Sequence, residues 1–454
     1  MNPEMVGTKG AAPDRFLAEY REVAGRMGKR EPAWLSERRE AAIDRFARVG
    51  FPTTREEDWR FTSLAPLMGT PFSIAHRHPS PQVGRDHLGL FMPPGPGAAH
   101  AVFVNGRFAP ALSAVAGLPA GVRLGSLADA LRSDGAVVEA HLGRHALAEG
   151  NPFTALTTAL WEDGAFLYVP KGVEVDAPIQ LLFLAAPGDG PSASYPRTLV
   201  VAERGSRVVV VETYAGVEDR AYLTSAVTEI VAAEGAQVTA CRIQRESELA
   251  YHMATTQSRG DRDATLASYT VAVGAALSRH DVNAVLGGAG GHLTLNGLSV
   301  LHGRQHVDHH TTIDHAAPHC ESHELFNGVL GDHARGVFSG RIIVRPGAQR
   351  TDSKQTNNNL LLSEEARADS QPQLEIYADD VKCTHGATLG PLDESALFYL
   401  QSRGIAPADA RSLMTYGFSA QIVGTVPVPE LRRQLDRLVR ATLDRGTRRP
   451  RAIP

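Results

Sequence analysis

Hydrophobic residues change their spacing twice along the chain, and these changes predict three regions. Between residues 13 and 49 they recur at helical intervals, with Phe16 and Trp34 near the start of two successive stripes. Between residues 164 and 390 helical spacing is almost absent, and short runs of β-branched residues take its place. Helical spacing then returns. We therefore expect an all-β core between small α-helical N- and C-terminal regions.

The β-branched runs of the central region are each followed by a corner centred on glycine. Three successive corners, at Gly205, Gly235 and Gly260, lie roughly 25 to 30 residues apart. Such a period is typical of a stack in which each repeat buries its apolar face on the next repeat. With strands and no interposed helices, the pattern favours a β-helix or similar β-solenoid. A sandwich of hairpins is the alternative, and it is disfavoured because two-residue hairpin turns are scarce after Asn105-Gly106.

The boundaries of the three regions follow from composition. Residues 79–100 are rich in Pro and Gly and are predicted to form a linker without a regular element. The hairpin expected around Asn105-Gly106 opens the next region. We therefore predict an N-terminal helical region with its linker at residues 1–100, a β-helix core at 101–390 and a C-terminal helical region at 391–454.

Three helices are predicted in the C-terminal region. Asp393 can cap the first, Pro407 opens the second, and the third follows Pro429 and carries an Arg-rich face. The second helix has an apolar stripe at helical spacing. Its members are Ala410, Leu413, Met414, Gly417 and Phe418.

Composition points away from nucleic-acid and membrane partners. Lys and Arg total 46 against 50 Asp and Glu, which leaves a formal net charge of -4. This balance indicates no basic surface for nucleic acid. No apolar stretch reaches about 18 residues, and the first dozen residues contain no signal-peptide core. We therefore expect a cytoplasmic chain without a membrane span.

The cysteines restrict the kinds of metal site that are possible. Cys241, Cys320 and Cys383 are widely spaced, which fits a reducing compartment and excludes a self-contained four-cysteine zinc or cluster site. Cys383 and His385 are two residues apart and would share one face of a strand. Such a pair can ligate a metal or activate a thiolate, although a buried structural cysteine is the commoner explanation. P-loop, nucleophile-elbow and zinc-protease motifs are absent from the sequence.

A histidine-rich segment is a second candidate site. Seven of the 18 histidines lie between His302 and His323. As a strand, the segment would place His306, Asp308 and His310 on one face, where they are weaker candidates for zinc or ferrous iron ligands. The alternative is a polar ladder in which each histidine bonds to neighbours on adjacent turns. The ladder is favoured because the spacing matches no established metal motif.

Several segments near the C-terminal end resemble a known family. They are Thr351–Leu362, Ala366–Asp369, Pro372–Thr388 and Leu397–Ile405, and the similarity is weaker at Glu57–Thr62 and Asp163–Gly172. In length and order they resemble the SufB/SufD family of iron-sulfur cluster assembly proteins. The resemblance implies a right-handed parallel β-helix between helical terminal regions. It also implies a scaffold subunit, because SufB and SufD pair with each other and with the ATPase SufC in a complex that assembles clusters.

Two departures place the resemblance on the SufD branch of the family. SufB typically has Glu where this chain has Gly386, and it carries an assembly cysteine near the position of Asn357. The resemblance then implies that Cys383 and His385 face the assembly site of a SufB-like partner, with His385 the stronger candidate. Iron or a nascent cluster would be held there only transiently, with no permanently bound cofactor. Independent cluster synthesis is not expected, since the cysteine is missing.

The resemblance also implies a second partner surface. The C-terminal helices, with Tyr399, Arg403, Met414 and Phe418 among their residues, are expected to dock a SufC-like ATPase. Alternatively, their apolar stripes pack only on the end of the β-helix. A homodimer of the isolated chain stays possible. Two rival functions remain, a metal-dependent enzyme on a β-solenoid and a purely structural bridge that never contacts metal.

Overall fold

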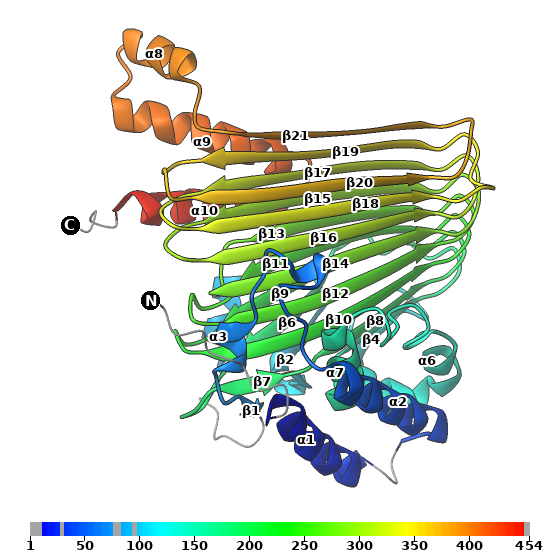
Figure 1. Ribbon diagram of the computed structural model, residues 1–454. Coiled ribbons are helices and arrows are strands. Elements are labelled where there is room, and N and C mark those ends of the chain that lie inside the picture. Colours follow the sequence, from blue (N-terminus) through cyan, green and yellow to red (C-terminus); the bar gives the residue numbers. More distant parts are fainter. Residues whose placement is uncertain (1–10, 28–30, 76–82, 93–97, 449–454) are drawn as a thin grey trace.

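The computed structural model describes residues 11–27, 31–75, 83–92 and 98–448, and its centre is a parallel β-solenoid of about eight turns (Figure 1). Each turn contributes one strand to each of two sheets, which we call sheet 1 and sheet 2. Helices lie at both ends of the stack. The predicted β-solenoid between small helical regions is therefore confirmed, and the alternative of a hairpin sandwich is wrong.

The strands pair in parallel from one turn to the next, apart from β3 and β4, which pair antiparallel with β2 and β5. Sheet 1 contains β1 (Ser73–Ile74), β4 (Arg123–Ser126), β5 (Ala165–Val169), β7 (Ser192–Ser194), β8 (Arg197–Ala202), β10 (Tyr222–Ala232), β12 (Tyr251–Gly260), β14 (Leu277–Leu286), β16 (His306–His315), β18 (Arg335–Val344) and β20 (Arg367–Ile376). Sheet 2 contains β2 (His100–Val104), β3 (Arg107–Phe108), β6 (Ile179–Ala185), β9 (Arg207–Gly216), β11 (Gln237–Arg245), β13 (Thr265–Ala272), β15 (His292–Leu301), β17 (Glu321–Leu330), β19 (Asp352–Leu361) and β21 (Lys382–Gly390).

Corners and the first hairpin form where the sequence predicted them, with one shift. Gly205 and Gly235 adopt φ angles of 65° and 66°, which favour glycine because they lie in the left-handed region. Asn105 and Gly106 also have positive φ and join β2 to β3 in an antiparallel pair. Gly260, in contrast, is the last residue of β12, so the corner begins after it.

The helices lie at the N-terminal end of the solenoid, along the outer face of sheet 2 and beyond the last turn (Figure 1). They are α1 (Ala11–Met27), α2 (Ala33–Val49), α3 (Ala65–Met68), α4 (Arg85–Phe91), α5 (Leu127–Ser133), α6 (Gly135–His141), α7 (Pro152–Leu160), α8 (Glu394–Ser402), α9 (Pro407–Val423) and α10 (Pro429–Arg448), with short 3-10 turns at Glu57–Trp59 and Pro110–Leu112. No helix in the described part of the chain is both long enough and apolar enough to span a membrane.

One expectation about the linker is wrong. Residues 85–91 form helix α4, although the stretch 79–100 was predicted to hold no regular element. Its prolines and most of its glycines flank this helix, and Leu88 and Phe91 stabilise it by packing against strands β2 and β6. Residues 76–82 and 93–97 lie outside the described residues.

The N-terminal helices form a cap over the first turns. Helix α7 is capped by Asn151, whose side chain accepts a hydrogen bond from the Phe153 amide. Helix α2 packs against α7, and its buried Arg39 donates to the carbonyl groups of Ala159 and Trp161. The helices α5 to α7 belong to this end of the molecule, inside the range expected for the β core.

The C-terminal helices start at the predicted residues. Asp393 caps α8, and Pro407 is the first residue of α9. Helices α9 and α10 cover the outer face of sheet 2, while α8 projects beyond the solenoid (Figure 1). The predicted stripe of α9 is rotated, because Leu413 is 52% exposed whereas Thr415, Ser419 and Ile422 are buried.

Candidate functional site

The last turn of the solenoid is the least covered part of its core. Strands β20 and β21 end the strand order of sheets 1 and 2, so each has one edge that no described strand pairs with. Most residues of β21 are exposed, whereas every residue of β6, β8 and β10 is buried. Unpaired backbone N–H and C=O groups make such an edge a template for another chain.

Cys383 and His385 lie on β21 at this open end. Their register partners on β19 are Ser353 and Gln355, both of which face the interior between the two sheets. Register partners in parallel strands point to the same face, so Cys383 and His385 both face the interior. Cys383 is half-buried against the apolar interior, and His385 is exposed. His385 is therefore not a buried core residue of the described chain.

The environment of Cys383 favours its neutral form in the free chain. Burial raises the pKa of the Cys383 thiol, and the nearby Asp352 raises it further. A thiol must lose its proton before it binds iron. Metal binding at Cys383 would therefore release a proton.

The second candidate, His306 with Asp308 and His310, is occupied by other contacts. Asp308 accepts a hydrogen bond from Thr62 (2.5 Å) and pairs with Arg279 (3.1 Å) on the outer face of sheet 1. The Nε2 atoms of His310 and His306 lie 3.1 Å from Asp308 and 2.9 Å from Thr62 respectively. Burial alone would raise the pKa of Asp308, but His310 and Arg279 hold it well below its ordinary value.

This geometry supports the polar ladder rather than a metal site. Arg279 already neutralises the Asp308 carboxylate and stacks on Trp59 at 3.8 Å, so the cluster fastens the segment around Trp59 to sheet 1. Among the residues that the structure describes, no group of three or more His, Cys, Asp or Glu side chains is placed to hold a metal ion.

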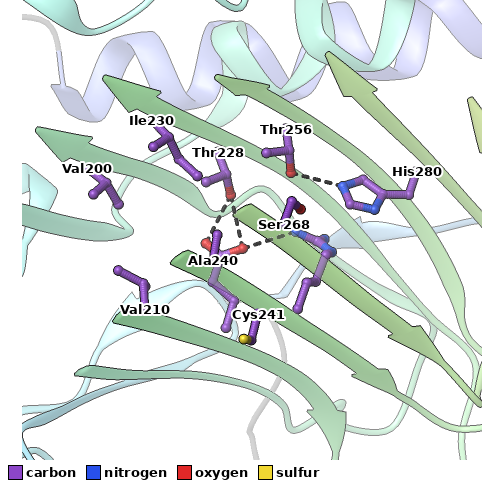
Figure 2. A pocket seen from close by; sticks show the side chains of 11 residues that line it. Val200, Val210, Thr228, Ile230, Ala240, Cys241, Thr256, Ser268 and His280 are labelled. Carbon is purple, nitrogen blue, oxygen red and sulfur yellow. Dashed lines mark hydrogen bonds and ion pairs between the residues drawn. The ribbon is translucent and has the colours of Figure 1, made fainter. Parts of the chain in front are cut away.

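The solenoid interior contains polar side chains and a small cavity, shown in Figure 2. Thr228 donates to Glu212, which pairs with Arg242 at 3.1 Å, and Thr256 bonds to His280 at 2.9 Å. Burial holds the pKa of His280 well below its ordinary value. The cavity has room for about one water molecule, so its polar groups serve one another rather than a substrate.

The four residues predicted to contact an ATPase separate into two pairs. Tyr399 is 57% exposed on α8, and Arg403 donates to its hydroxyl at 2.9 Å. Met414 and Phe418 are half-buried and pack α9 against α8 and Leu360 of the solenoid. Only Tyr399 and Arg403 are therefore presented on the surface, next to the exposed Phe398.

Comparisons with known proteins cover nearly the whole chain. The family model described as the SUF system FeS cluster assembly SufBD core domain matches residues 183–418, and the SufBD protein N-terminal region matches residues 11–181. An iron-sulfur cluster assembly SufBD family protein of Synechocystis is 33% identical, over 94% of this chain and 95% of that protein. The iron-sulfur cluster assembly proteins SufD of Escherichia coli and Bacillus subtilis are 32% and 29% identical, over 89% and 95% of this chain and 92% and 98% of their own lengths.

Proposed function

This chain belongs to the SufBD family of iron-sulfur cluster assembly proteins, and from that premise we propose that it is a SufD-like scaffold subunit rather than a free-standing enzyme. In this proposal it pairs with a SufB-like subunit and binds a SufC-like ATPase. The relatives named SufD in two bacteria support the SufD-like assignment.

The observation that carries the proposal is the open end of the solenoid. Cys383 and His385 stand on the interior face of β21, whose outer edge has no partner strand in the described chain. A second solenoid placed against β20 and β21 would satisfy these edges and cover both side chains. A thiolate and an imidazole are suited to iron or to a nascent cluster.

Two ligands explain why the chain would work with a partner. A tetrahedral iron site needs four ligands, and Cys383 and His385 supply two of them. The remaining ligands would come from the facing subunit or from the cluster sulfides. Iron and cluster are then cargo at the interface, held only while both subunits are in place.

Surface chemistry supports docking of the ATPase at α8. Phe398, Tyr399 and Leu413 are 73%, 57% and 52% exposed, which is unusual for large apolar side chains grouped on two neighbouring helices. Arg403 stacks on Tyr399 with 5.0 Å between its guanidinium carbon and the ring centre, which orients an aromatic and cationic pair outward. Aromatic and arginine side chains often dominate binding energy at protein interfaces.

The assembly role is tested with His385→Ala in the purified complex. We expect the variant to retain its partners and its melting temperature but to lose cluster absorbance when ferrous iron and sulfide are supplied. Thr384→Ala is the matched control, because Thr384 is exposed on the opposite face of the same strand. Full cluster yield from His385→Ala would refute the ligand role and favour a purely structural bridge.

The docking role is tested with Tyr399→Ala and Arg403→Ala by co-purification of the ATPase. We expect reduced recovery from both variants without loss of folding. Arg433→Ala, on an exposed face of α10, is a control for general loss of surface charge. Unchanged recovery from both α8 variants would show that these helices only cover the solenoid.

A further inference from the structure

Two rows of interior side chains run through the last turns of sheet 2 and end on the two candidate ligands. The first row is Glu324, Gln355 and His385, which are successive register partners on β17, β19 and β21. The second row ends on Cys383 in the same way and contains Ser322 and Ser353. In this second row, Ser322 bonds to Ser353 at 2.7 Å and to His315 at 2.9 Å.

The first row is a hydrogen-bonded chain in which Gln355, the member next to His385, keeps a free acceptor. Gln355 is 1% exposed and its Nε2 atom donates to Oε2 of Glu324 at 2.7 Å. Within the described part of the chain, the Oε1 atom of Gln355 is buried and has no hydrogen-bond partner. A buried amide oxygen normally accepts a bond, and leaving it without one costs about 1 to 3 kcal/mol. The next side chain in the row is His385.

The opposite wall of the interior leaves space for this arrangement. A Cβ atom on Gly340 of β18 would lie 2.3 Å from Nε2 of Gln355, a distance that real contacts do not reach. Glycine at this position therefore makes room for the Gln355 amide. The row depends on both sheets of the solenoid.

We propose that Gln355 and Glu324 are positioning residues for His385: Gln355 accepts the ring N–H of His385 through Oε1 and thereby turns the other ring nitrogen toward iron. The proposal rests on the proposed function, in which a partner covers the open end. The covered imidazole must then place its N–H on an acceptor, and Oε1 of Gln355 is the buried acceptor at the adjacent register position. Ligating histidines commonly donate their other N–H in this way, which fixes the tautomer.

Glu324 determines which end of the Gln355 amide faces His385. An ionised carboxylate only accepts hydrogen bonds, so it requires Nε2 of Gln355 on its side and leaves Oε1 on the side of His385. A protonated carboxyl can donate, so it also permits the reversed amide. Burial raises the pKa of Glu324 to about 7, which places this change near neutral pH. Above that pH, the Gln355 amide would therefore keep the single orientation that turns Oε1 toward His385.

Other titratable groups around Glu324 do not change charge in that range. His309 and His315 of β16 face the same interior, and burial lowers the pKa of each to about 4. His280 of β14 is held well below its ordinary pKa by burial. The register partner of Glu324 on β15 is Leu295, and Thr311 of β16 also contacts Glu324; neither residue titrates.

The test is a double-mutant cycle in the complete complex, with cluster yield from ferrous iron and sulfide as the readout. We expect Gln355→Leu to reduce the cluster yield about 10-fold, a typical loss when the hydrogen-bond partner of a ligating histidine is removed. In a chain that already carries His385→Ala, Gln355→Leu should cause no further loss. Thr256→Val is the matched control, since it removes another buried interior bond far from the open end. Equal losses from Gln355→Leu in both backgrounds would overturn the inference. No effect of His385→Ala alone would instead overturn the proposed function.

A second variant keeps the inference testable if Gln355→Leu fails to fold. Glu324→Gln preserves size but never becomes an obligate acceptor, so either amide orientation stays possible at any pH. We expect the wild-type yield to rise between about pH 6 and pH 8 more steeply than the yield of Glu324→Gln. Identical pH profiles for the two proteins would contradict the role of Glu324, because a merely structural residue would lower the yield without changing the profile.

Discussion

The two ends of the solenoid are built from the same repeat but completed in opposite ways. At the N-terminal end, helices α2 and α7 cover the first turns, and the side chains of Arg197 and Glu229 form an ion pair with exposures of 1% and 0%. At the C-terminal end, Ile376, Tyr377 and Leu389 are 40%, 59% and 58% exposed. One end therefore carries its own cap, whereas the other has exposed apolar side chains and strand edges that no described strand covers.

This difference shows that the residues of the N-terminal end contribute more to the stability of the fold than those of the open end. Glu229 accepts hydrogen bonds from three backbone amides, those of Gly143, His145 and Ala146, in addition to its pairing with Arg197. Burial alone would raise the pKa of Glu229, but these partners lower it. A charge that is buried with every acceptor satisfied is costly to disturb. On the described strand β20, by contrast, the ion pairs of Arg335 with Asp369 and of Arg341 with Glu375 are partly exposed, so residues of the open end can change with less effect on folding.

The largest expected effect comes from breaking the N-terminal cap. Glu229→Ala leaves Arg197 buried without its carboxylate and should lower the free energy of unfolding by about 3 to 5 kcal/mol. Chemical denaturation of the isolated chain measures this loss. Thr384→Ala, at the open end, should change the same quantity by less than about 0.5 kcal/mol. Similar losses from both variants would remove the contrast between the ends.

A smaller effect concerns the buried acid behind the open end. Because burial raises the folded-state pKa of Glu324 to about 7, the folded chain binds its proton more tightly than the unfolded chain does. Protonated Glu324 therefore adds about 3 kcal/mol to the free energy of unfolding below about pH 4.5, and this contribution is lost as the pH rises to about 7. Glu324→Gln should remove that decline. Neutral buried histidines contribute equally to both proteins, so the difference between the two stability profiles isolates Glu324.

The periodicity of the sequence predicts those strands and helices well that have an apolar face. The β-branched runs between residues 164 and 390 became strands, and Asp393 and Pro407 start helices as the sequence predicted. Polar strands such as β12 and β19 were missed, since their interior side chains bond to neighbouring turns instead of forming an apolar face. Hydrophobicity alone does not detect such strands.

The residues behind the candidate site were missed for a related reason. Glu324, Gln355 and His385 are about 30 residues apart, which is the period of the solenoid, so the repeat contained the signal. Their alignment requires the register of three strands, and the irregular corners conceal that register in the sequence. Cys383 and His385 were found because they are two residues apart on one strand.

The apolar surface of the open end should matter for association rather than folding. Leu389→Ser is expected to weaken binding of the proposed SufB-like partner by about 1 to 2 kcal/mol, or roughly 5- to 30-fold in Kd. Calorimetric titration of the two purified subunits measures this change. Leu249→Ser is the matched control, because Leu249 is 51% exposed at a corner away from the last turn. Equal weakening by both variants would mean that the open end is not the binding surface.

The smallest effect is expected from His385→Ala, and it distinguishes a ligand from a structural residue at the open end. His385 is exposed on β21, and no hydrogen bond of its side chain is found among the described residues. His385→Ala in the isolated chain should therefore change the free energy of unfolding by less than about 0.5 kcal/mol, as exposed substitutions usually do. A satisfied core histidine would instead cost about 1 to 3 kcal/mol. Thermal and chemical denaturation of the isolated chain, compared with cluster yield in the complex, distinguishes these cases. A loss of stability above about 1 kcal/mol would show that the open end supports folding as the capped end does. Unchanged stability together with lost cluster yield would show that His385 acts only when the complex is assembled.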